Sequence, residues 1–328
     1  MSGVNLINEN NLSACKALKE ISSHKIFVLV ALNIVLFVFF SLYTPHFFSM
    51  ANFPMIMLNM AVNGVLAIGL TFCIITVGID LSVGSVLGLS GVVAATLNNM
   101  GVHWVTCLFV GLMVGMTCGL VTGSLVSLFK IPAFIASLGM QSMALGLALT
   151  ITRGTPVSNT MREIRPIGVD RLFGFFPYTW VIMLVCFVIA HFILQYTRTG
   201  RYFYTIGGNP EAARFSGINL RFYTALPFIF SGLMAAVAAF LLIGRTASAD
   251  AVSGQGMELD AIAATIIGGT SMRGGEGIMV GTFLGALLMT ILRNGMVHMG
   301  MTTHPQRIVL GAIIIIVVVI DITSKSRK

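Results

Sequence analysis

The first group of residues with chemical potential lies where a long apolar stretch is interrupted. Residues 78–85 place Asp80, Ser82 and Ser85 between two apolar runs. One interpretation is structural: Asp80 caps a helix that begins at Leu81, because its carboxylate can accept from the backbone N–H of Ser82 or Val83 and suits the positive helix end. The other is that the interruption lines a path for a polar solute, to which the three side chains offer hydrogen bonds. Both interpretations stay open at this point.

Two asparagines in the preceding apolar run are further candidates for such a path. They are Asn59 and Asn63. Amide side chains both donate and accept hydrogen bonds, which suits contact with a polar solute.

A second polar segment, residues 207–218, carries every signal of one short helix. Asn209 is the predicted N-cap, Pro210 takes the first helical position and Glu211 lies in the first turn. Arg214 lies toward the C-terminal end, and Gly217 is the residue that ends the helix. Two turns are marginally stable alone in water, so this helix is expected to pack on its own bundle or on a partner.

A third segment, residues 258–277, resembles the first in its order of features. Glu258 and Asp260 are predicted to cap a short apolar helix, and a glycine-rich break with Gly274 and Gly275 precedes another apolar run. The similarity predicts an internal repeat that relates the second and third spans to the eighth and ninth.

Motifs of enzymes and metal sites do not occur in the sequence. It has no G-x-S-x-G, no H-E-x-x-H and no nucleotide-binding P-loop, and its five cysteines form no C-x-x-C pair. We therefore expect no catalytic residue, no metal and no cofactor.

Composition identifies the setting in which these segments lie. Of 328 residues, 19 are Lys or Arg and 11 are Asp or Glu, so 9% are charged, whereas 56% are apolar. The mean hydropathy is +0.95. A soluble domain has about 25% charged residues, and a globule of this size cannot bury so much apolar surface. The chain is therefore predicted to be an all-α polytopic membrane protein, which excludes a soluble enzyme, a secreted disulfide scaffold and a nucleic-acid binder.

About ten transmembrane helices are expected, since a span needs about 20 apolar residues. The third and eighth are short or interrupted. Gly111, Gly115, Gly119 and Gly123 share one face of the fourth span, which predicts close helix packing in lipid. The predicted spans are 26–44, 55–79, 81–98, 104–129, 132–152, 178–197, 224–243, 259–270, 278–297 and 306–322.

The basic residues predict the orientation. Placing segment 1–25, loop 198–223 and tail 323–328 in the cytoplasm puts ten of the 19 Lys and Arg inside. Lys130 and Arg273 then also fall inside, which makes 12 of 19, in agreement with the positive-inside rule. The transmembrane domain is then 26–322, and both termini are cytoplasmic. The basic cluster at 153–171 opposes this orientation, because it falls in an external loop.

Together the three segments resemble the signature regions of the ribose/xylose/arabinose-type permeases of ABC sugar importers. The likeness extends from about residue 26 to 322, is strongest to ribose permeases with the D-allose permease near, and includes Asn52 and residues 131–135. The sequence departs from the ribose pattern at Pro210 and at Arg273.

The resemblance implies a permease subunit in the bacterial inner membrane that translocates a monosaccharide such as a ribose- or allose-like sugar. It implies two permease copies, a cytoplasmic ATP-binding subunit that hydrolyses ATP, and a periplasmic sugar-binding protein. It also implies that residues 207–218 contact the ATP-binding subunit, through Asn209, Glu211, Arg214 and Gly217.

Other transport functions are alternatives. A branched-chain amino acid or a furanose-like signal molecule are alternative solutes. An ion-coupled transporter needs titratable groups inside the bundle, and Asp80 is nearly the only one that the sequence predicts there. An intramembrane enzyme lacks a nucleophile and a base.

Overall fold

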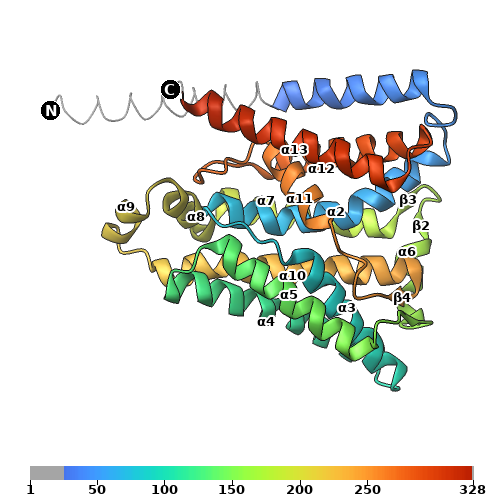
Figure 1. The fold of residues 1–328 in the computed structure, drawn as a ribbon, viewed down its shortest axis with the longest axis horizontal. Helices are drawn as coiled ribbons and strands as arrows, with labels where there is room; N and C mark the ends of the chain where they lie inside the picture. Colours follow the sequence, from blue (N-terminus) through green and yellow to red (C-terminus); the bar gives the residue numbers. More distant parts are fainter. Residues whose placement is uncertain (1–25, 327–328) are drawn as a thin grey trace.

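The computed structural model describes residues 26–326, which form a bundle of helices (Figure 1). The predicted N-terminal segment 1–25 and the last two residues of the predicted tail lie outside the described residues. The long helices are Ile26–Tyr43, α2 (Asn52–Ile75), α3 (Val83–Asn99), α4 (Trp104–Phe129), α5 (Ala133–Thr152), α7 (Tyr178–Tyr196), α10 (Leu220–Thr246), α12 (Met279–His298) and α13 (Thr303–Ser326).

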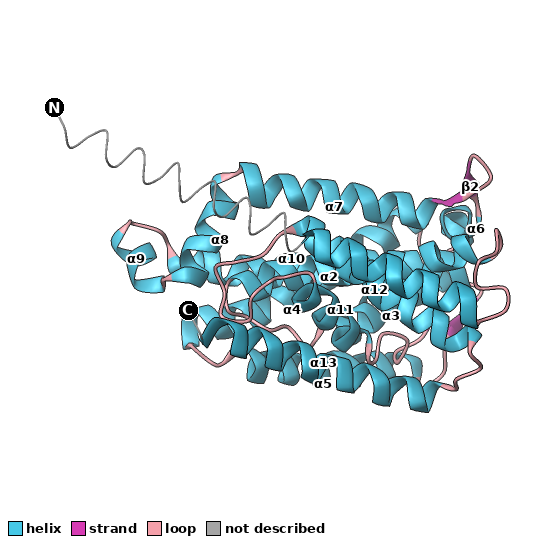
Figure 2. Ribbon diagram, turned by 90° about the horizontal axis from the view of Figure 1, so that it is seen from above, coloured by secondary structure: helices cyan, strands magenta, loops and turns pink. Residues whose placement is uncertain are grey.

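Short elements lie at the two ends of the bundle (Figures 1 and 2). At one end, called the α9 end, are α8 (Arg198–Gly208) and α9 (Pro210–Phe215). At the other, called the α6 end, are the 3-10 helix Arg162–Ile164, α6 (Arg165–Val169) and four two-residue strands. β1 (Val157–Ser158) pairs with β4 (Ser248–Ala249), and β2 (Arg171–Leu172) pairs with β3 (Phe176–Pro177), both antiparallel.

Seven of the described helices are long and apolar enough to cross a membrane, which confirms the all-α polytopic class. Each of the ten predicted spans corresponds to a helix. The predicted eighth span, expected to be short or interrupted, is α11 (Met257–Ile267), whose 11 residues are roughly 16 Å long against a hydrocarbon core of about 30 Å, so this helix alone does not span the core. α3, with 17 residues, is also short.

α2 lies at the centre of the bundle. The most apolar part of this helix is 83% buried, whereas the corresponding part of Ile26–Tyr43 is 17% buried. α7, α10, α11 and α12 pack around α2. A central helix with little exposed surface places its polar side chains inside the protein, so Asn59 and Asn63 must face interior space or a partner.

Glycines set how closely the helices pack. The predicted glycine face of α4 is confirmed: all four residues are buried against α10. A Cβ at Gly115 would collide with the backbone of Gly232, and one at Gly119 with the backbone of Phe228. Close backbone approach of this kind maximises van der Waals contact, which is the main force between helices in lipid.

Two long helices are each followed by a break and a shorter helix. α2 leads through residues 76–82 to α3, and α10 leads through residues 247–256 to α11. The start of α3 meets the second break, since a Cβ at Gly84 would collide with the backbone of Gly254. The predicted internal repeat, which relates the second and third spans to the eighth and ninth, stays a prediction.

Candidate functional site

A cavity of about 660 Å³ lies in the half of the bundle toward the α6 end. Its wall is formed by the first half of α2, the second half of α12, the C-terminal end of α10 and the start of α13. Ligand sites are typically cavities of about 300–1,000 Å³ with a few placed polar groups. The polar residues in this wall are His46, Ser49, Asn52, Asn59, Asn63, Arg245, Thr290, Arg293, Asn294, His298, Thr303 and Gln306.

Hydrogen bonds fix the polar side chains of the two main walls. The amides of Asn52 on α2 and Asn294 on α12 exchange two bonds of 2.9 and 3.0 Å, and His298 Nε2 lies 3.1 Å from Asn52 Oδ1. Arg245 Nη1 donates to Asn59 Oδ1 at 2.8 Å. These bonds join α2 to α12 and α10 at the α6 end, and they orient amide and guanidinium groups along the cavity.

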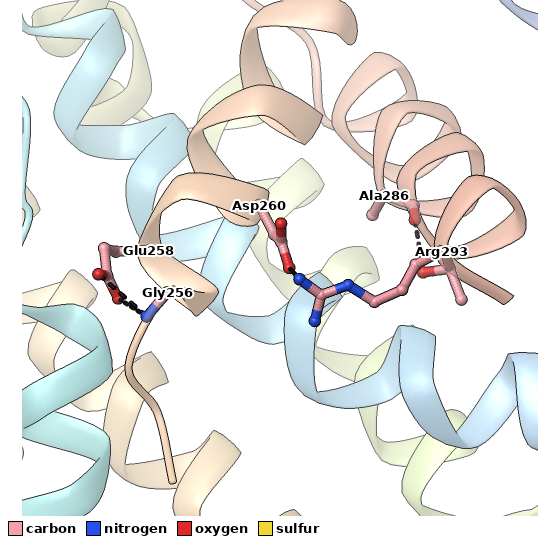
Figure 3. Close-up of polar contacts among 6 residues, drawn as sticks. Gly256, Glu258, Asp260, Ala286 and Arg293 are labelled. Carbon is pink, nitrogen blue, oxygen red and sulfur yellow. Dashed lines mark hydrogen bonds and ion pairs between the residues drawn. The ribbon is translucent and has the colours of Figure 1, made fainter. Parts of the chain in front are cut away.

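An ion pair lies where this cavity adjoins a second one of about 450 Å³ (Figure 3). Arg293 on α12 reaches the carboxylate of Asp260 on α11, with 2.6 Å between Nη2 and Oδ2. Arg293 lines both cavities, as do Thr303 and Gln306. The pair therefore belongs to the wall that the two cavities share.

The two acidic residues of α11 have different roles. Glu258 reaches back to the start of the helix, where both of its carboxylate oxygens lie 3.1 Å from the backbone N of Gly256 (Figure 3). That bond agrees with the predicted capping role of Glu258. Asp260, predicted as a second cap, also lies in the first turn of α11, but its carboxylate is directed to α12, where it pairs with Arg293.

Asp80 is buried, with 2% of its surface exposed, but α3 begins at Val83 and not at Leu81. Its carboxylate accepts from the backbone N of Ser82 at 3.0 Å and from the Ser82 hydroxyl at 2.6 Å. It therefore stabilises the turn before α3 instead of capping a helix at Leu81. Neither cavity is lined by Asp80, Ser82 or Ser85, whereas Asn59 and Asn63 both line the larger one.

Several cavity residues were not among the predicted site residues. Asn294 and Arg293 are adjacent polar residues inside the ninth apolar run, and intramembrane polar residues commonly mark solute paths, so that signal was present in the sequence. Arg245 and Gln306 lie near span ends, where polar residues are ordinary. Only the fold shows that they face the same cavity.

The α9 segment has the local structure that the sequence predicts. Asn209 Oδ1 accepts from the N–H of Ala212 at 3.0 Å, and Pro210 takes the first helical position. Gly217 follows the helix with φ of +77°, a left-handed conformation that favours glycine. Glu211 and Arg214 are exposed, and Phe215 is 88% exposed. A large apolar ring is thus presented at the α9 end with little contact to its own bundle.

The glycine-rich break before α12 also contains the predicted residues. Gly274 and Gly275 have φ of +79° and +71°, so both adopt the left-handed conformation in the loop between α11 and α12. Both glycines therefore lie after the end of α11 and before the start of α12.

The cavity presents groups that hydrogen-bond polar solutes. Amide side chains donate and accept, and guanidinium donates in a planar fork. In residues 26–326, no group of three or more His, Cys, Asp and Glu residues could hold a metal ion. A bundle of membrane helices around a polar cavity is the architecture of a permease, a protein that passes solute through the membrane.

Comparison with known proteins agrees with this class. Residues 52–318 match the family described as the permease component of branched-chain amino acid transport systems, and the chain belongs to this family. It is accordingly a multi-pass membrane protein and a transport subunit, not a catalytic one.

Curated relatives are similar over nearly their whole length. The ribose import permease protein RbsC of Escherichia coli (strain K12) is 38% identical over 297 residues, which cover 89% of this chain and 92% of the relative. The D-allose transport system permease protein AlsC of the same strain is 33% identical, covering 88% and 89%. The xylose transport system permease protein XylH of that strain is 32% identical, covering 93% of each chain. No solved structure matches.

Proposed function

We propose that the chain is the membrane-spanning permease subunit of a binding-protein-dependent ABC importer, and that it carries a monosaccharide such as a ribose- or allose-like sugar. The observation that carries the proposal is the polar cavity, with its amide and guanidinium wall. Sugar hydroxyls both donate and accept, so side chains that do the same can replace the water that a sugar leaves behind. The ribose, allose and xylose permeases among the relatives support this solute class.

The partners follow from the same proposal. A separate ATP-binding subunit supplies the energy, a periplasmic sugar-binding protein delivers the solute, and a second copy of the chain completes the transporter. The ATP-binding subunit docks on α9, where Asn209, Glu211, Arg214 and Gly217 shape a helix that presents Phe215. That places the α9 end and both termini in the cytoplasm of a cell whose inner membrane holds the protein.

Orientation can be tested separately from transport. Reporter fusions at Thr160, near β1 at the α6 end, and at Phe215 in α9 should report opposite sides of the membrane. Alkaline phosphatase activity is expected from the Thr160 fusion alone. Activity from the Phe215 fusion alone would show the inverted orientation. The same result from both fusions would contradict an odd number of crossings between the two residues.

Solute and energy source are tested in vesicles that contain the permease together with its ATP-binding subunit and its binding protein. We expect ATP-dependent uptake of labelled ribose, allose or xylose that vanadate inhibits and that collapse of the proton gradient leaves unchanged. Labelled leucine is the matched solute for the amino acid alternative. Uptake of leucine alone would reject the sugar proposal, and uptake that follows the proton gradient would reject the ATP-driven one.

A further inference from the structure

Three distant parts of the chain meet at the α9 end of the bundle. They are the end of α2, the end of α8 and the loop 268–278 that precedes α12. The backbone N–H of Gly275 donates to the carbonyl oxygen of Ile75 at 2.8 Å. The hydroxyl of Tyr204, on α8, donates to the carbonyl oxygen of Gly277 at 2.7 Å. These two bonds link α8 to the loop, and the loop to α2.

The junction is made of backbone in direct contact. A Cβ added at Gly207 would collide with the carbonyl oxygen of Ile75 and with the backbone N of Gly275. One added at Gly275 would collide with the backbone of Gly208. Backbone atoms cannot move aside by changing rotamer as a long side chain does, so a displacement of α8 must displace the other two segments.

Tyr204 supplies a side-chain bond from α8 to this junction, and its hydroxyl is protonated at neutral pH. Burial raises the pKa of Tyr204 to about 12. The protonated phenol therefore donates to the carbonyl of Gly277 throughout the physiological range. α12 begins at Met279, directly after this contact.

Both helices held at the junction are cavity walls. α2 ends at Ile75 and carries Asn52, Asn59 and Asn63 in its first half, whereas α12 begins beside Gly277 and carries Arg293 and Asn294 in its second half. At the α6 end the Asn52–Asn294 amide pair ties the same helices together. A shift at the junction is thus a shift of the two walls that face the solute.

We infer that the junction of α8 with Ile75 and Gly275–Gly277 transmits movement of the α8–α9 segment to the cavity walls, and that Tyr204 is its positioning residue. The inference rests on the proposed function, because it requires that α9 receive the ATP-binding subunit. Only Asn209 separates α8 from α9, so a displacement of α9 also displaces α8.

The test is Tyr204→Phe, which keeps the ring and removes the hydroxyl, with Tyr202→Phe on the same helix as matched control. Four quantities are measured in reconstituted vesicles: permease abundance, copurification of the ATP-binding subunit, sugar-stimulated ATP hydrolysis and sugar uptake. We expect Tyr204→Phe to keep the first three and to lower the sugar carried per ATP by about two- to tenfold, the effect of one neutral hydrogen bond. Tyr202→Phe should keep the wild-type ratio.

Each other outcome overturns the inference. If Tyr204→Phe carries as much sugar per ATP as the wild type, the hydroxyl has no role in coupling. If Tyr202→Phe lowers the sugar carried per ATP equally, the effect belongs to α8 as a whole and not to the Tyr204 hydroxyl. Loss of copurification assigns Tyr204 to docking, and failure of the variant to accumulate assigns it to folding. Failure of the proposed function is seen separately, as absence of ATP-dependent sugar uptake by the wild-type complex.

Discussion

Arg293 Nη2 lies 2.6 Å from Asp260 Oδ2, and this contact joins α12 to α11 in the wall between the two cavities. The Asp260 side chain is 5% exposed, whereas that of Arg293 is 40% exposed. The carboxylate therefore depends on the guanidinium, while the guanidinium retains access to the cavity. A buried charge that loses its partner is costly, but replacing both partners together is much less so.

Arg293→Gln should lower stability, because it leaves the buried Asp260 carboxylate without a counter-charge. We expect a loss of about 1–3 kcal/mol, below the 3–5 kcal/mol of a fully buried pair because Arg293 is partly exposed. The double variant Asp260→Asn with Arg293→Gln should recover most of that loss. Melting temperatures of the purified permease in detergent measure both effects, and additive losses in the double variant would contradict the coupling of these residues.

Asn63→Leu separates a role in transport from a role in folding. Among the described residues Asn63 Oδ1 is buried without a hydrogen-bond partner, although the side chain lines the larger cavity. Leucine therefore removes no bond that the folded protein makes, so stability should stay within about 0.5 kcal/mol of wild type or rise. Sugar uptake per permease should fall, because a polar group that faces the solute is lost.

The matched control for Asn63 is Asn99→Leu. Asn99 is exposed at the end of α3, where its amide donates to the backbone of Ser158, and it lines neither cavity. Its uptake should equal that of wild type. Normal uptake by Asn63→Leu would place the solute path away from this part of α2.

Asp80 can be tested for the two interpretations that the sequence leaves open. Asp80→Asn should fold, because an amide oxygen still accepts from Ser82, whereas Asp80→Leu should lose about 1 kcal/mol or more. Full uptake by a normally abundant Asn variant would leave Asp80 a structural residue. A folded Asn variant without uptake would show that transport needs its charge.

Gly217→Val and Glu211→Lys test the docking of the ATP-binding subunit on α9. Valine at φ of +77° is strained, and lysine reverses a charge that stabilises the helix start. We expect both variants to insert and to bind the sugar-loaded binding protein, but to lose at least about tenfold in copurification of the ATP-binding subunit, a change of about 1.4 kcal/mol. Ser216→Ala is the control, since its hydroxyl bonds only within α9. Wild-type copurification and sugar-stimulated hydrolysis from both variants would remove α9 from the mechanism.

Local chemistry alone determined several features of this protein. Composition predicted the membrane class, and the signals at Asn209, Pro210 and Gly217 predicted a short helix that the structure confirms. The spacing of the glycines from Gly111 to Gly123 predicted a close helix contact. These features depend on a residue and its neighbours within a few turns, so the sequence contains all the information they need.

Only the tertiary structure decided what each polar residue faces. Asp260 and Arg293 have the types of an ion pair, but they lie on different helices, and their partnership depends on how α11 and α12 pack. Likewise Asn52 meets Asn294 because α2 and α12 lie side by side, while Asp80, the most conspicuous acid in the sequence, lies away from both cavities. Contacts between distant segments follow from the packing of whole helices, which no local spacing encodes.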